Sequence, residues 1–146
     1  MNKLNHKGFT LVELAIGLAI IAVLILAIAV GSGVLDNARV QSAGESVRTL
    51  HVAAENYIAS GNLTYTGISI DSLKTSKFLP SGFSATGSNP WNGDFQVAVN
   101  ATDSTQVDIG LTTISQQTAD RLDSLFANTA SSTSYNTNTQ TWTVTF

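Results

Sequence analysis

The sequence contains no cysteine and only two histidines, His6 and His51. Without thiols, the chain cannot form a disulfide scaffold, a thiolate zinc site or a thiol nucleophile. Two histidines are also too few for a histidine-rich metal site. The absent residue types therefore exclude thiol chemistry and the metal centres that depend on cysteine or on several histidines.

Charged residues are scarce as well. Asp, Glu, Lys and Arg make up 12% of the chain, against roughly 25% in an ordinary soluble domain. The formal net charge of -3 gives no electrostatic footprint for nucleic acid, and a hydrophobic share of 43% argues against intrinsic disorder. Neither a glycine-rich phosphate loop nor a catalytic constellation is present. We therefore expect that the chain is not an enzyme and that it holds no cofactor and no metal.

Hydrophobic residues are concentrated near the amino terminus. Residues 14–30 form an unbroken apolar run, LAIGLAIIAVLILAIAV. Extended to Leu35, the run reaches roughly 22 residues, which is enough to cross a bilayer core as a helix. Lys3 and Lys7 precede it and would stay in the cytoplasm by the positive-inside rule. The polar remainder of the chain predicts one translocated, soluble domain behind a single membrane span.

One carboxylate lies at the start of this apolar segment. A charge such as that of Glu13 costs about 2.5–3.5 kcal/mol inside a membrane helix, so it normally has a partner. No Lys or Arg lies within one helical turn after it. Cleavage between Gly8 and Phe9 would create an α-amino group that could meet Glu13 of a staggered neighbouring subunit.

Two simpler interpretations of the same segment stay open. A secretory signal peptide could be cut after Ala27-Ile28-Ala29, so that the mature chain would begin at Val30. Alternatively, the apolar run could be a plain membrane anchor. In either case Glu13 would have no assigned partner.

The residues Lys7–Leu14, KGFTLVEL, followed by the apolar run, resemble the class III signal of type IV pilins and their pseudopilin relatives. The resemblance implies that a prepilin peptidase removes residues 1–8 by cleaving between Gly8 and Phe9, and that it N-methylates Phe9. Glu13 matches the family's acidic residue at mature position five. This match implies an assembly salt bridge between Glu13 and the Phe9 amine of a neighbouring subunit.

The apolar run continues into an amphipathic pattern with apolar residues mostly three or four apart from Leu35 to Ile58. This pattern predicts one helix from Phe9 to about Ser60. Residues 9–35 would be its membrane-spanning and filament-core part, and residues 36–60 its amphipathic part. Gly31 and Gly33 lie at the join and weaken a helix by about 1 kcal/mol each. We expect either a hinge that melts in a filament or a flexible linker there.

Residues 61–146 predict a globular α+β head exposed on the filament surface. Alternating apolar residues predict strands over 94–100, 106–111 and 141–146, with a further short strand within 63–70. Helices are predicted over 71–79 and from a cap at Ser115 to about Asn128, and residues 129–140 predict a low-complexity loop. The expected fold is a long helix packed on a small antiparallel sheet with one inserted helix.

The carboxyl-terminal part carries a second resemblance. Residues 89–93, NPWNG, and 114–122, ISQQTADRL, are similar to type IVb and conjugative thin-pilus pilins. Those relatives usually have a cysteine in that helix, where this chain has Ala119. Because the chain contains no cysteine, it cannot form their disulfide. The eight-residue leader and Phe9 are more typical of the type IVa branch.

Together, the resemblances imply a subunit that polymerises into a type IV pilus after leader cleavage and N-methylation. Its partners would be other copies of itself in a helical homopolymer, the prepilin peptidase/N-methyltransferase, and the assembly platform and motor of the inner membrane. The precursor would lie in the bacterial inner membrane and the product in an extracellular filament. A pseudopilin of a type II secretion or DNA-uptake system, and a monomeric anchored or secreted binding domain, are the alternatives. Adhesion, twitching motility, DNA uptake and conjugation are not distinguished by these residues.

Overall fold

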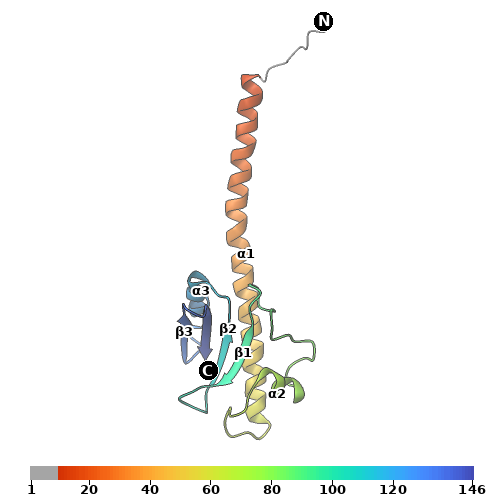
Figure 1. The fold of residues 1–146 in the computed structure, drawn as a ribbon, viewed down its shortest axis with the longest axis vertical. Coiled ribbons are helices and arrows are strands. Elements are labelled where there is room, and N and C mark those ends of the chain that lie inside the picture. The colour runs from red at the N-terminus through yellow and green to blue at the C-terminus, as the bar shows by residue number, and fades with distance from the viewer. Residues whose placement is uncertain (1–9) are drawn as a thin grey trace. The chain divides into compact units, whose positions relative to one another are not determined.

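The computed structural model describes residues 10–146, and it describes the side-chain surroundings of all of these except residues 27–34. The chain divides into two compact units, Met1–Asn37 and Ala38–Phe146. Helix α1 (Leu11–Ala59) begins in the first unit and ends in the second (Figure 1). The prediction of one long amino-terminal helix is therefore confirmed.

Helix α1 ends at Ala59, close to the predicted end at about Ser60. Gly61 has a φ of 109°, a conformation that glycine adopts at no steric cost. The Asn62 side chain donates a 2.8 Å hydrogen bond to the Tyr57 carbonyl, so it satisfies one of the free carbonyls at the helix end.

The amphipathic part of α1 buries one stripe of small and aliphatic side chains in the second unit. The stripe begins at Val40, whereas the sequence pattern started it at Leu35, which is 63% exposed. Leu35 belongs to the first unit, where α1 is the only described element. The buried residues of the stripe are Val40, Ala43, Val47, Leu50, Ala53 and Ala54.

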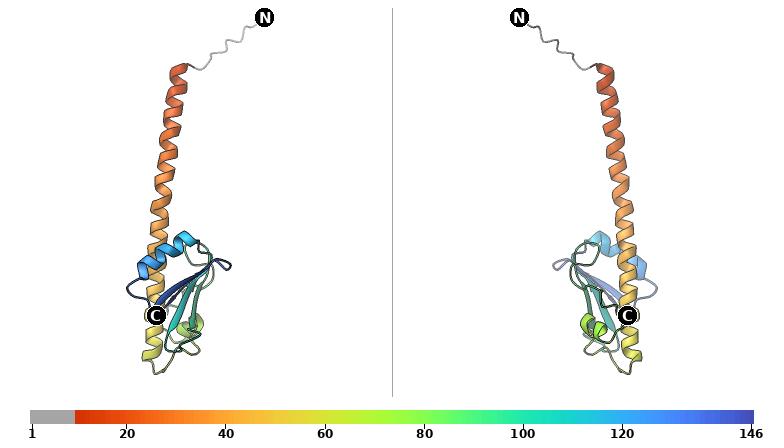
Figure 2. Two further views of the ribbon diagram at one scale, coloured as in Figure 1. Left: turned by 90° about the vertical axis from the view of Figure 1, so that its left-hand side faces the viewer. Right: turned by 90° about the vertical axis from the view of Figure 1, so that its right-hand side faces the viewer.

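A four-stranded antiparallel sheet forms the centre of the second unit. Its strands are β1 (Phe95–Val99), β2 (Val107–Leu111), β3 (Ser132–Asn136) and β4 (Thr141–Thr145). They lie in the order β1-β2-β4-β3, and every neighbouring pair is antiparallel. The sheet lies beside the carboxyl-terminal part of α1 (Figure 2).

The inner face of the sheet and the buried stripe of α1 share one hydrophobic core. Helix α3 (Gln116–Phe126), between β2 and β3 in the chain, adds Ala119, Leu122 and Phe126. Its predicted cap is confirmed, since the Ser115 hydroxyl accepts from the Thr118 amide. The sheet's buried side chains are Phe95, Val97, Val107, Ile109, Leu111, Trp142 and Val144. The predicted α+β fold is therefore confirmed.

Strand β3 corrects the prediction of a loop over residues 129–140. Its sequence, STSYN, alternates exposed and half-buried residues, with Thr133 and Tyr135 on the half-buried side. The strand pairs along its whole length with β4, which the alternation of large apolar residues did predict. Because β3 is a polar edge strand, its own composition carried no hydrophobic signal.

The segment between α1 and the sheet is also more irregular than predicted. Residues 63–69 contain no strand, and helix α2 (Ile70–Thr75) is shorter than the predicted 71–79. Ser69 begins α2 with a capping box to Ser72, and Lys77, at a φ of 61°, breaks the helical path soon after its end. Local capping and turn conformations, and not hydrophobic alternation, determine this segment.

The NPWNG segment, residues 89–93, contains a buried hydrogen-bonding centre. The Asn89 side-chain amide donates to the Thr112 carbonyl at 2.8 Å, and its oxygen accepts from the amides of Trp91 and Gly93 at 3.0 and 2.8 Å. A Cβ on Gly93 would overlap the Thr112 carbonyl. Hydrogen bonds of this segment therefore connect the residues that precede β1 to the residue that follows β2.

Candidate functional site

The residues predicted for processing and assembly lie at the beginning of α1. Gly8 and Phe9, the predicted cleavage and methylation residues, lie outside the described residues. Glu13 is described, and it lies in the first turn of the helix. Gly31 and Gly33 lie inside α1, which is continuous across them in the single chain.

Thr10 and Glu13 form a reciprocal capping box at the start of α1. The Thr10 hydroxyl accepts a 3.2 Å hydrogen bond from the Glu13 amide. In return, Glu13 Oε2 accepts from the Thr10 backbone amide and from the Thr10 hydroxyl, both at 2.9 Å. This arrangement satisfies amide donors that have no partner at a helix start, and the carboxylate also complements the positive end of the helix dipole.

The capping box holds the Glu13 carboxylate at the end of the helix without using all of its hydrogen-bonding capacity. Oε2 accepts both bonds from Thr10, whereas Oε1 accepts none from any residue in the range 10–146. The side chain is exposed. The arrangement therefore presents one carboxylate oxygen to a cation from outside the described part of the chain.

Thr10 is the functional residue that the sequence interpretation missed. The signal was present, because Thr10-Leu11-Val12-Glu13 has the spacing of a capping box before an apolar run. Glu13 was instead interpreted only as a charge seeking an intermolecular partner. Its hydrogen bonds to Thr10 within the chain add a local role to that prediction.

After the capping box, α1 presents apolar side chains on all sides. Between residues 11 and 26, these side chains are between 53% and 85% exposed. Exposure of so much contiguous apolar surface is unusual for a soluble monomer and marks a surface that becomes covered. The residues are Leu11, Val12, Leu14, Ile16, Leu18, Ile20, Ile21, Val23, Leu24, Ile25 and Leu26.

Among the residues that the structure describes, none belongs to a helix that is both long and apolar enough to cross a membrane.

Two carboxylates of the second unit, those of Asp108 and Asp123, join elements of the fold. Asp108 accepts hydrogen bonds from the side chains of Asn100 and Thr145 at 2.9 and 2.8 Å. Asp123 accepts one from the Trp142 indole at 2.7 Å. Within residues 10–146, no group of three or more His, Asp or Glu side chains is placed to hold a metal ion. These acidic side chains therefore act as hydrogen-bond acceptors that join elements of the head.

One comparison with known proteins covers this part of the chain. Residues 3–29 match the family model described as the prokaryotic N-terminal methylation motif. No curated protein and no solved structure gives a significant match to the chain. The motif supports a type IV pilin-like or pseudopilin precursor, a class of structural protein that a prepilin peptidase processes.

Proposed function

We propose that this chain is the major structural subunit of a type IV pilus. The methylation motif over residues 3–29 carries the proposal. It overlaps a helical segment whose described apolar side chains are exposed over residues 11–26. Packing of this segment against the same segment of other copies would bury that surface, and each Å² of apolar area removed from water contributes about 25 cal/mol.

In the proposed pathway, the precursor resides in the bacterial inner membrane. Lys3 and Lys7 keep the leader in the cytoplasm, and the apolar part of the helix, residues 9–35, holds the subunit in the bilayer. The prepilin peptidase cleaves between Gly8 and Phe9 and N-methylates Phe9. The assembly platform and motor of the inner membrane then add the subunit to an extracellular homopolymer.

Glu13 would pair with the Phe9 amine of a neighbouring subunit and so set the axial stagger of the filament. The exposed carboxylate and its available Oε1 atom support this role. Inside a bundle of apolar helices the attraction is strong, because the dielectric constant is low. An unpaired charge there is costly for the same reason, so correct stagger is favoured over incorrect stagger.

Gly31 and Gly33 would act as a hinge when the subunit leaves the membrane for the filament. Each glycine weakens a helix by about 1 kcal/mol relative to alanine. The helix is continuous across them in the single chain, so melting would have to be driven by packing between copies. In this proposal, the head from residue 61 onwards forms the outer surface of the filament.

A pseudopilin of a type II secretion or DNA-uptake system is the second candidate, because the same methylation motif supports it equally. The two candidates differ in their product. A major pilin forms long filaments that can be sheared from the cell surface, whereas a pseudopilin forms only short ones.

Two measurements on material sheared from cells that express the chain test the proposal. Mass spectrometry tests the processing of the amino terminus, and electron microscopy of the same sample tests the assembly of filaments. We expect long filaments whose subunits begin at N-methylated Phe9. A mature start at Val30, or an unprocessed Met1 confined to the membrane fraction, would refute the processing pathway. Correct processing without long filaments would favour the pseudopilin.

A further inference from the structure

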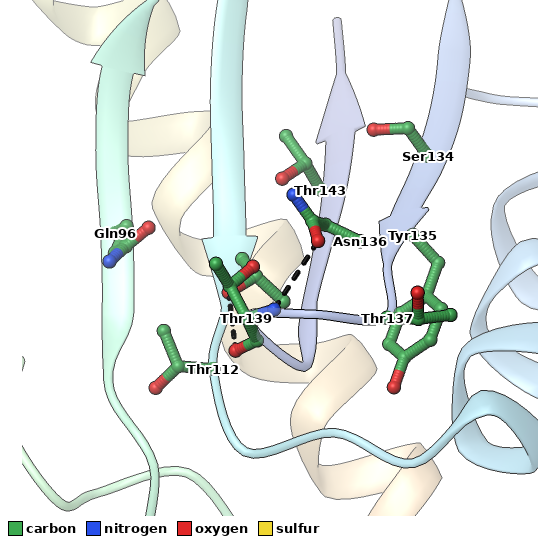
Figure 3. A pocket seen from close by; sticks show the side chains of 9 residues that line it. Gln96, Thr112, Ser134, Tyr135, Asn136, Thr137, Thr139 and Thr143 are labelled. Carbon is green, nitrogen blue, oxygen red and sulfur yellow. Dashed lines mark hydrogen bonds between the residues drawn. The ribbon is translucent and has the colours of Figure 1, made fainter.

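The outer face of the sheet carries a polar hollow that none of the roles above uses. It is an open depression with a volume of about 930 Å³, and it lies over the face opposite the hydrophobic core, next to the β3–β4 turn (Figure 3). Gln96, Thr143 and Ser134 lie in one cross-strand row, with Gly110 between Gln96 and Thr143. The lining residues are Gln96, Thr112, Ser134, Tyr135, Asn136, Thr137, Thr139, Thr141 and Thr143.

No lining residue is charged, and all of them carry hydroxyl or amide groups. Hydroxyls can donate and accept hydrogen bonds, and a side-chain amide has both kinds of group. A ligand whose groups both donate and accept hydrogen bonds would find partners among these side chains. An ionic ligand would lose hydrating water without gaining an opposite charge. The chemistry of the lining therefore selects a neutral ligand rich in hydroxyl groups.

Much of this hydrogen-bonding capacity is unused by the fold. Within residues 10–146, the side chains of Gln96, Ser134 and Thr143 form no hydrogen bond. By contrast, the Thr112 and Thr141 hydroxyls are engaged, the first accepting from the Asp94 amide and the second donating to the Thr139 carbonyl. The free groups come from β1, β3 and β4, so their spacing is fixed by the sheet.

Tyr135 borders the hollow at the end of β3, but its side chain belongs to the core-facing side of the strand, opposite Trp142. Its hydroxyl donates a 2.6 Å hydrogen bond to the Ile114 carbonyl, so the orientation of the ring is held by the end of the β2–α3 connection. The ring is half-buried. The packed ring therefore holds the end of β3 in place, and with it the free Ser134 hydroxyl on the opposite side of the strand.

The connections next to the hollow hold two residues in a strained conformation. Thr113 follows the lining residue Thr112 and has a φ of 63°, and Gln140 lies between the lining residues Thr139 and Thr141 with a φ of 50°. The Ile114 amide donates to the Gln140 carbonyl at 2.9 Å. A positive φ is unfavourable for a β-branched residue such as Thr113, and strain of this kind gathers at binding sites.

We propose that this hollow binds a neutral carbohydrate of one or two sugar units. The volume lies within the range of small-molecule sites, and the lining matches hydroxyl groups without selecting a charge. All of the residues that carry this argument belong to the unit Ala38–Phe146. The proposal therefore does not depend on the processing or polymerisation of the chain.

The test uses the full chain in detergent micelles and saturation-transfer NMR with lactose, maltose and N,N′-diacetylchitobiose as neutral probes. Sialyllactose is the charged probe, since it adds one carboxylated sugar to lactose. We expect at least one neutral probe to bind with a Kd in the millimolar range, a binding free energy of about −4 kcal/mol. If no neutral probe binds, or if sialyllactose alone binds, the proposal is wrong.

Two matched substitutions on β3 locate the binding. Ser134 and Ser132 are both exposed and lie two residues apart on one strand face, but only Ser134 lines the hollow. We expect Ser134→Leu to weaken the binding of the neutral probe by at least about tenfold and Ser132→Leu to leave it unchanged. An equal effect of the two substitutions would overturn the proposal.

Thr143→Val provides an independent variant that preserves shape and favours a strand. It removes a free hydroxyl from the floor of the hollow, and we expect a loss of about threefold in affinity or more. Circular dichroism of each variant checks that the head is folded. If Thr143→Val and Ser134→Leu both bind the sugar as the parent chain does, the ligand lies elsewhere and the assignment fails.

Discussion

At the scale of single residues, Asn89 joins two parts of the head that are far apart in the sequence. It is almost fully buried, and no buried side-chain polar atom among residues 10–146 lacks a partner. Its amide nitrogen lies between the carbonyls of Thr112 and Asp94, at 2.8 and 3.5 Å. An unsatisfied buried group costs about 1–3 kcal/mol, so this side chain is difficult to replace.

We expect Asn89→Ala to lower the free energy of unfolding of the head by about 2–3 kcal/mol, because it leaves the Thr112 carbonyl and the Gly93 amide without partners. Asn89→Asp should destabilise the head as well, because a carboxylate faces two carbonyls in place of the donor. Urea unfolding followed by tryptophan fluorescence measures both. Asn138→Ala, in the exposed β3–β4 turn, is the control and should change stability by less than about 0.5 kcal/mol.

His51 gives the head a pH-dependent stability. Its ring stacks on Phe146 with a centroid distance of 3.9 Å. Burial lowers the pKa of His51 below 6.5, and the charge of nearby Glu55 only partly opposes this shift. The unfolded chain therefore binds the proton first as the pH falls, and stability decreases from about pH 6.5 down to the pKa of the folded state.

The contribution of His51 is measured by comparing the parent chain with His51→Gln in urea at pH 7.5 and pH 5.0. We expect the parent to lose more stability between the two pH values than the variant, because glutamine does not titrate. The carboxylates titrate in both chains, so their effect cancels in the difference. Equal losses in the two chains would show that protonation of His51 is not linked to folding.

At the scale of the elements, the first turn of α1 depends on one hydroxyl. Thr10→Ala removes the acceptor for the Glu13 amide, and N-cap replacements of this kind cost about 1 kcal/mol. We expect hydrogen exchange at residues 11–14 to become faster in micelles. Thr10→Ser retains the hydroxyl and is the matched control. Unchanged exchange in Thr10→Ala would mean that the capping box does not stabilise this helix start.

The elements with strong periodic signals were predicted well. Strands β1, β2 and β4 alternate large apolar side chains, and α3 has a serine cap and an inner stripe, so their patterns reflect their burial. Strand β3 was missed because its side chains are polar and its pairing with β4 is set by the rest of the sheet. The polar hollow was missed with it, since its lining comes from β1, the end of β2, β3, β4 and their turns.

The amino-terminal site was predicted from the sequence only in part. A position-specific signal placed Gly8, Phe9 and Glu13, and the family match over residues 3–29 supports that class. The local partner of Glu13 required geometry, because the interpretation followed charge alone and did not consider the cap at Thr10. The cap at Thr10 could have been predicted from the sequence, because its residue types and spacing are those of a capping box. That Oε1 of Glu13 accepts no hydrogen bond from the described residues could be learned only from the structure.

At the scale of the whole molecule, Glu13 links the subunit to its neighbours in the proposed filament. Glu13→Gln keeps an oxygen that can accept from Thr10 but removes the charge, whereas Glu13→Ala removes both. We expect both variants to be cleaved after Gly8 and both to yield few or no sheared filaments, by immunoblot and electron microscopy. Glu45→Gln, an exposed acid on the amphipathic part of α1, should assemble normally.

The comparison of the two Glu13 variants separates the role of the charge from that of the cap. Filaments at the parent level from Glu13→Gln, with loss only in Glu13→Ala, would assign Glu13 to capping and refute the salt bridge. Filaments at the parent level from both variants would remove Glu13 from assembly altogether.

The strand order gives the head a constraint on when it can fold. Strand β4 lies between β2 and β3 although it is the last strand in the sequence, and its Trp142 and Val144 are fully buried in the core. During synthesis, the core shared by the inner face of β2 and the stripe of α1 therefore stays incomplete until residues 141–145 have been made. Incompletely covered apolar surface promotes misassembly, so the nascent head needs protection until β4 has been added.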